Sequence, residues 1–335
     1  MNRMMHKGIG LAFALCLLAG LMPARAADAA SAQSPTAQAL KQDAACTRCH
    51  DEMSAKPILQ MYQTRHGVKA DARTPTCQSC HGKSDKHLAG AGSDATGVRP
   101  LPDIVFKSGQ KGGKLSSAVE DSNSCLACHK EGKRSHWDGS QHQSQDVACS
   151  SCHNIHVKAD RVLNKATQSE VCFSCHKTER AQTHRNSTHP LDAGKMACSD
   201  CHNPHGSVGP KLLVKASVNE TCYTCHAEKR GPFLWEHSPV SDDCTNCHTP
   251  HGSASNNLLK ARPPFLCQEC HQDHGSSLKS GNSVPAAAGS PAAGLNSAAA
   301  LNGKYLTVQG NGRACLNCHV MVHGSNSPNG AKFNR

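Results

Sequence analysis

The chain has 335 residues, a formal net charge of +11, 3% aromatic residues and 21 cysteines. So few aromatic side chains are hard to reconcile with two ordinary domains, each built on a large apolar core. The basic charge suggests an acidic partner, but aromatic residues are not interleaved with the basic ones as in nucleic-acid interfaces. We therefore expect no nucleic-acid partner.

The first residues have the features of a signal peptide. Two basic residues precede an apolar run from Ile9 to Met22, and the segment ends in Ala-Arg-Ala, typical of a signal-peptidase site. The run has about 14 residues, fewer than the roughly 20 of a membrane-spanning helix. We predict a signal peptide over 1–26, a disordered N-terminus over 27–45, and a mature chain that does not cross a membrane by itself.

Twenty of the 21 cysteines form ten Cys-x-x-Cys pairs, and a histidine directly follows each pair. C-x-x-C-H is the attachment sequence of c-type haem, in which both thiols form thioethers and the histidine binds the iron. Structural zinc sites, disulfides and thioredoxin-like redox pairs also use C-x-x-C, but none of them requires histidine at the next position. The sequence therefore predicts ten covalent c-type haems.

The predicted thioether residues are the two cysteines of each motif. They are Cys46, Cys49, Cys77, Cys80, Cys125, Cys128, Cys149, Cys152, Cys172, Cys175, Cys198, Cys201, Cys222, Cys225, Cys244, Cys247, Cys267, Cys270, Cys315 and Cys318. The predicted proximal iron ligands are the histidines that close the motifs. They are His50, His81, His129, His153, His176, His202, His226, His248, His271 and His319.

Ten haems would account for the unusual composition and charge. They leave about 31 residues of mature chain per haem, so most apolar burial would be peptide against porphyrin. Their propionates bring about 20 negative charges, which offset the basic surplus. Export followed by haem attachment also explains why an exported chain keeps so many cysteines without needing disulfides. These properties indicate a bacterial periplasmic protein.

The motifs repeat in pairs with a period of about 47 residues. In the middle units a motif, a free histidine, a second motif and a further histidine follow in this order. If the sequence CHNPH is helical, its two histidines share one face, whereas the axial ligands of one iron approach opposite faces of a porphyrin. The second histidine should therefore bind a neighbouring haem, and which iron each one serves stays open.

The same rule selects ten of the twelve spare histidines in the mature chain as distal iron ligands. They are His66, His87, His142, His156, His189, His205, His237, His251, His274 and His323. We interpret the other two, His136 and His184, as surface or propionate-contacting residues. The mature chain has four methionines, too few to replace histidine as the general sixth ligand.

Gly, Pro, Asn and Ser are spread through the chain, and long strand-like alternation is lacking. We predict a multihaem cytochrome c fold, with mostly short helices and irregular loops around a linear chain of ten haems and little β-structure. The motifs suggest an N-terminal pentahaem half over 46–176 and a C-terminal one over 177–335. The second half contains an Ala/Gly/Ser-rich insert at about 276–311, which is either a linker or a docking loop.

Three segments carry a closer resemblance: SVNETCYTCHAEKRGPFLWEHSPV at 217–240, CSDCHNPHGS at 198–207 and CLNCHVMVHGSN at 315–326. With the ten motifs, they resemble the periplasmic decahaem cytochromes of the Mtr, Mto and DmsE type over nearly all of the mature chain. The resemblance implies a bis-histidine haem chain inserted into an outer-membrane β-barrel porin, located in the periplasm and associated with the outer membrane through that barrel.

Its implied partners are periplasmic electron-transfer cytochromes at one end and an extracellular multihaem cytochrome or metal at the other. The direction, iron oxidation or metal reduction, stays open. A soluble periplasmic shuttle to a terminal reductase would need the same haems without a barrel. A haem enzyme reducing nitrite, sulfite or a metal would need an open axial site, often marked by lysine in place of the motif histidine, and all ten motifs end in histidine. We therefore expect an electron-transfer protein.

Overall fold

The structure is a computed structural model that describes residues 35–51, 53, 58–68, 73–90, 99–106, 117–271, 315–328 and 330–333. The predicted signal peptide, the predicted insert at 276–311 and His274 lie outside these residues. Within them, none of the helices is long and apolar enough to cross a membrane.

Short helices make up the regular structure of the described residues. The α-helices are α1 Pro35–Thr47, α2 Cys77–His81, α3 Asp85–Ala89, α4 Ala118–Leu126, α5 Gln141–Ser144, α6 Lys165–Phe173, α7 Lys177–Thr183, α8 Cys198–Cys201, α9 Val218–Cys222, α10 Ser238–Asp242 and α11 Phe265–Gln268. The 3-10 helices are η1 Ile58–Gln63, η2 Gly132–Arg134, η3 Cys149–Ser151, η4 Arg161–Leu163, η5 Pro210–Leu212, η6 Ala227–Lys229, η7 Cys244–Asn246, η8 Asn256–Leu258 and η9 Cys315–Asn317. Extended structure in this part is limited to isolated β-bridges. The predicted fold class is confirmed.

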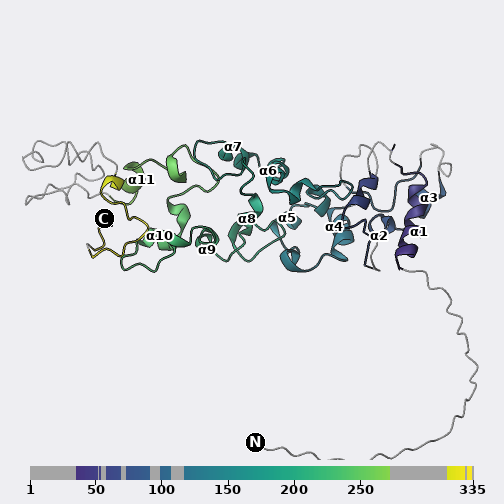
Figure 1. Cartoon of the computed structure of the whole chain (residues 1–335), viewed down its shortest axis with the longest axis horizontal. Helices are drawn as coiled ribbons and strands as arrows, with labels where there is room; N and C mark the ends of the chain where they lie inside the picture. Colours follow the sequence, from purple (N-terminus) through teal and green to yellow (C-terminus); the bar gives the residue numbers. More distant parts are fainter. Residues whose placement is uncertain are drawn as a thin grey trace, which may run out of the picture.

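The elements follow the sequence along one long axis (Figure 1). Helices α1 to α3 lie at one end of the molecule, α4 to α9 occupy its middle, and α10, α11 and η9 lie at the other end. Because the motifs are carried by these elements, they are also arranged in sequence order from one end to the other.

The predicted disordered N-terminus is wrong from Pro35 onwards, because α1 covers Pro35–Thr47. Its Asp43 is 2% exposed and accepts hydrogen bonds from Tyr62 Oη and from Cys77 N, both at 2.9 Å. The helix is therefore anchored by residues far along the chain, which the local composition does not reveal.

The core contains few large apolar side chains. The buried apolar residues of the described part are Ala39, Ala118, Trp137, Ala148, Phe173 and Ala197. Leu163 and Phe265, in contrast, are 75% and 68% exposed. Side-chain packing of this extent cannot stabilise so long a chain, which agrees with the expectation that the peptide packs mainly against porphyrins.

Each motif closes one turn of helix. In nine motifs the histidine N–H donates to the carbonyl of the first cysteine at 2.8–3.1 Å, and the remaining motif forms α2. In this turn the two cysteines are three residues apart and lie on one side of the segment, and the histidine is the last residue of the turn.

The two motifs of a unit are joined by a hydrogen bond. A polar side chain one turn before the first cysteine of the first motif bonds a residue of the second motif. The contacts are Cys77 N to Asp43 Oδ1 (2.9 Å), Ser150 Oγ to Asp121 Oδ2 (3.0 Å), Ser199 N to Gln168 Oε1 (2.9 Å) and Cys244 N to Asn219 Oδ1 (2.7 Å). In the third unit Lys165 also pairs with Asp200 at 3.0 Å. The two contacts of the third unit cross the boundary that the sequence suggested after residue 176.

Candidate haem sites

Nine pairs of histidine rings face one another, and each joins one motif histidine to one spare histidine. The pairs, with the distances between ring centroids, are His50–His87 (6.0 Å), His66–His129 (5.8 Å), His81–His156 (5.9 Å), His142–His176 (6.1 Å), His153–His205 (6.1 Å), His189–His226 (6.4 Å), His202–His251 (6.0 Å), His237–His271 (6.0 Å) and His248–His323 (6.1 Å). They contain nine of the predicted distal histidines. The tenth, His274, lies outside the described residues.

The geometry of the pairs differs from ordinary ring packing. Their separations span only 5.8–6.4 Å, while their interplanar angles range from 12° to 78°. In direct aromatic contacts the ring centroids lie anywhere from about 4.5 to 7 Å apart. Two imidazoles that bind one metal from opposite sides, each at about 2.0–2.1 Å, have centroids roughly 6 Å apart at any tilt. The pairs therefore fit axial ligation of an iron between them.

The pairing links successive units in both directions. A spare histidine that follows the second motif of a unit reaches back, as His156, His205, His251 and His323 do toward His81, His153, His202 and His248. A spare histidine between the two motifs reaches forward, as His66, His142, His189 and His237 do toward His129, His176, His226 and His271. His87 is the exception, since it faces His50 within its own unit.

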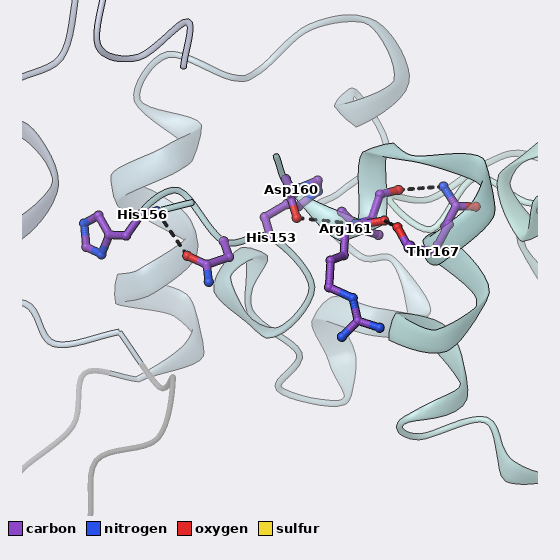
Figure 2. A network of polar contacts seen from close by, with 8 residues as sticks. His153, His156, Asp160, Arg161 and Thr167 are labelled. Carbon is purple, nitrogen blue, oxygen red and sulfur yellow. Dashed lines mark hydrogen bonds and ion pairs between the residues drawn. The ribbon is translucent and has the colours of Figure 1, made fainter. Parts of the chain in front are cut away.

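The helical arrangement assumed for CHNPH is wrong. Helix α8 ends at Cys201, and His202 is extended with φ −115° and ψ 143°. A turn closed by Gly206 N to Asn203 O at 3.1 Å then presents His205 toward His153. The equivalent residues His153 and His156 point in different directions in Figure 2. The two histidines serve different pairs because the chain turns between them.

A glycine after the spare histidine is a functional feature that the sequence reasoning missed. Gly206, Gly252 and Gly324 have φ values of 105°, 142° and 136°. A Cβ at these positions would lie 1.9 Å from His136 O, 2.0 Å from Gln182 O and 2.2 Å from Phe233 Cδ2, respectively. Only glycine allows the turn to dock this closely on the preceding unit. The recurring His-Gly dipeptide is the signal that could have revealed it.

Backbone carbonyls orient many of the rings. The bonds from Nδ1 are His81 to Ile104 O (2.9 Å), His87 to Pro100 O (2.7 Å), His142 to Pro204 O (2.8 Å), His189 to Pro250 O (2.9 Å), His202 to Lys211 O (2.9 Å), His237 to Val322 O (3.0 Å), His248 to Asn257 O (2.8 Å) and His319 to Lys332 O (2.5 Å). A carbonyl can only accept, so Nδ1 carries the proton and Nε2 keeps a lone pair for a metal.

Burial keeps several rings in the neutral form that binds metal. It lowers the pKa of His205 to about 4, with a smaller contribution from the nearby His153. Burial also lowers the pKa values of His129, His251 and His323. Neutral imidazole is the form that ligates a metal, and these rings therefore need no deprotonation near neutral pH.

A continuous cavity of about 6020 Å³ runs along the molecule and is lined by residues of the second to tenth motifs, from Cys80 to His319. Ordinary ligand pockets enclose about 300–1,000 Å³. Buried Arg134 Nε, Trp137 Nε1 and His205 Nδ1 have no hydrogen-bond partner among the described residues, and orphaned polar atoms of this kind are rare in folded proteins. The space and these atoms fit large cofactors that carry polar groups.

The other two spare histidines lie apart from the nine pairs. His136 and His184 are exposed, and His184 Nδ1 lies 3.6 Å from Asp192 Oδ2. Both positions agree with the interpretation of these residues as surface histidines.

Known proteins share these features. The family model of the doubled CXXCH motif matches residues 142–181, 189–231 and 237–276, and each match begins at a spare histidine that reaches forward. The model of cytochrome c554 and c-prime matches residues 20–82 and 98–154.

Individual relatives cover more of the chain. The multihaem cytochrome MtrA of Shewanella baltica (strain OS185) is 42% identical over 298 residues, which is 87% of this chain and 80% of the relative. The cytochrome c-type protein NrfB of Escherichia coli O6:H1 is 27% identical over 177 residues, 50% of this chain and 84% of that protein. NrfB of Haemophilus influenzae is 27% identical over 150 residues, 39% of this chain and 63% of that protein. With its C-x-x-C-H turns and opposed histidines, the chain belongs to the MtrA family of multihaem c-type cytochromes.

Proposed function

We propose that the protein carries electrons along ten bis-histidine c-type haems, as the cytochrome subunit of a conduit across the outer membrane. The observation that carries the proposal is the uninterrupted series of nine opposed histidine pairs along one elongated molecule. Haem supplies reversible one-electron chemistry at its iron when bound. The twenty motif cysteines anchor the cofactors, and the paired histidines bind each iron from opposite faces.

The residues around these positions support electron transfer. The two histidines of each of the nine pairs would both bind the iron held there, which would leave no iron position for a substrate at those sites. The protein's role is to fix ligands and distances and to set reduction potentials through ligation, burial and nearby charge. We propose that His319 at the tenth site pairs with His274, the predicted distal ligand that lies outside the described residues and is not used by the nine pairs.

The order of the motifs supports an assignment of the two ends. The first motif would exchange electrons with periplasmic electron-transfer cytochromes, and the tenth with an extracellular multihaem cytochrome or a metal. The middle of the rod would lie inside an outer-membrane β-barrel porin, with the protein entering from the periplasm. The similarity to MtrA over 87% of the chain favours this arrangement. The NrfB matches over about half of the chain keep a periplasmic shuttle as the second candidate.

Haem content provides one test. We expect the pyridine haemochrome assay and intact mass of the exported holoprotein to give ten haems per chain, and its ferric electron paramagnetic resonance (EPR) spectrum to contain only low-spin iron, because every iron has two nitrogen ligands. A smaller haem count or several high-spin irons in the native protein would contradict the ligand assignment.

Membrane fractionation provides a second test. We expect the protein to sediment with outer membranes and, after mild detergent extraction, to purify in a stable complex with a β-barrel protein. Deleting the barrel gene should release the cytochrome into the periplasmic fraction with its ten haems intact. A cytochrome that is fully soluble in cells that contain all barrel proteins would favour the shuttle instead.

A further inference from the structure

The motif histidine of the fourth motif has an unusual hydrogen-bond partner. The equivalent histidines of the second, sixth, eighth and tenth motifs donate from Nδ1 to backbone carbonyls. His153 Nδ1 instead lies 2.7 Å from Asp160 Oδ2, and Figure 2 draws both side chains. Carboxylates also lie near His176 and His226, but at 3.7 and 3.8 Å, beyond hydrogen-bond distance.

The difference arises from a shorter loop. In the third and fourth units the acceptor is nine residues after the motif histidine, and β-bridges His202–Leu213 and His248–Leu259 hold the returning chain. In the second unit the acceptor is seven residues after His153. A side-chain carboxylate therefore occupies the place that a peptide carbonyl has in the other two loops.

Asp160 is held firmly in this place. Its side chain is 11% exposed, and its second oxygen accepts from Val162 N at 3.4 Å, which caps η4. Thr167 Oγ1 and Gln168 Nε2 donate to carbonyls of η4 at 2.7 and 2.8 Å. These bonds attach the Asp160 loop to α6, the helix that carries the first cysteine of the fifth motif (Figure 2).

We propose that Asp160 is a positioning residue that, through His153, lowers the reduction potential of the fourth haem. The inference rests on the proposed ligation of this haem by His153 and His205. Reduction adds one electron to Fe(III) and removes one positive charge from the site. A full negative charge on the ligand's N–H stabilises the oxidised state more than the partial charge of a carbonyl, and it makes Nε2 a stronger donor.

The opposite ligand reinforces this asymmetry. His205 Nδ1 is buried without a hydrogen-bond partner among the described residues. Within the described part of the chain, the hydrogen bond to this pair of ligands therefore comes from the Asp160 side.

The test is the variant Asp160→Asn in the full-length holoprotein. Asparagine keeps the size of the side chain and one acceptor oxygen, which can face His153, so the variant loses the negative charge and, besides it, only the longer bond from Val162 N at 3.4 Å. We expect one of the ten haems to shift to higher potential in a spectroelectrochemical titration. A tenfold change in its reduction equilibrium corresponds to about 59 mV. The g values of one low-spin ferric haem should change as well.

The control is Asp138→Asn, which removes an exposed carboxylate that accepts from Gln143 Nε2 at 3.2 Å, lies outside the motifs and bonds no histidine. It should leave the titration and the g values nearly unchanged. Ten low-spin haems with an unshifted titration in Asp160→Asn would overturn the proposal, and so would an equal shift in the control or a new high-spin signal in Asp160→Asn. A wild-type protein with fewer than ten low-spin haems would instead refute the ligand assignment on which the proposal rests.

Discussion

Replacing His205 with alanine will convert one of the ten proposed haems from low-spin to high-spin and leave the others unchanged. His205 faces His153 at 6.1 Å, and the described residues place no other histidine in that pair. Alanine leaves the iron with one protein ligand and an open position. EPR and visible spectra of the ferric holoprotein measure the result as about one tenth of the iron in a high-spin form.

The control is His184→Ala. His184 lies on the surface, apart from the nine pairs, so its loss should change neither the spin state nor the haem count. If both variants keep ten low-spin haems, the assignment of His205 is wrong. Replacing His205 with methionine should restore a low-spin site, but at higher potential, because a thioether ligand raises the potential of haem iron.

Gly206→Ala should be strongly destabilising. The position has φ +105°, and the added Cβ would lie 1.9 Å from His136 O, a backbone atom that cannot move aside easily. Backbone strain and overpacking each cost about 1–3 kcal/mol, so we expect a loss of about 2–6 kcal/mol. The turn would also move away from the preceding unit, and a fraction of the fourth haem should lose His205. Thermal unfolding followed by the Soret band and the high-spin EPR signal measures the two effects.

Gly132→Ala is the matched control, in the preceding unit on which Gly206 docks. Gly132 also has a positive φ, +66°, but a Cβ there would meet no atom within 4 Å. The left-handed conformation alone costs about 1–2 kcal/mol. If the two variants lose the same stability and both remain fully low-spin, close docking of the turn does not matter for ligation.

The sequence predicts much of the site because its pattern is dictated by covalent chemistry. Ten C-x-x-C-H motifs and the rule that each unit has two spare histidines select nine residues that the structure places in ring pairs with motif histidines, and they leave out His136 and His184. These choices require only the order of residues along one repeat. The fold class also follows, since turn-forming residues occur everywhere.

What the sequence does not predict depends on contacts between units. The partner of each spare histidine lies in another repeat, so the alternation of backward and forward pairs is not visible locally. A helix over CHNPH is a wrong prediction because i, i+3 spacing alone does not define a helix, and the backbone is extended at His202. Helix α1 is not predictable from local sequence because Asp43 finds its partner at Cys77. In the sequence Asp160 is an ordinary loop residue, and only the structure shows that its carboxylate accepts a hydrogen bond from His153.

The alternation of backward and forward pairs has a consequence for biogenesis. A secreted chain enters the periplasm with its N-terminus first, so the second, fourth, sixth and eighth cofactors can be attached before the segments that complete their coordination have been translocated. On this assignment, intermediates arrested during secretion should carry five-coordinate iron near the translocation channel, and this iron would bind small ligands such as carbon monoxide. The second ligand of each of these irons would then bind in sequence order, as the corresponding segment of the chain emerges into the periplasm.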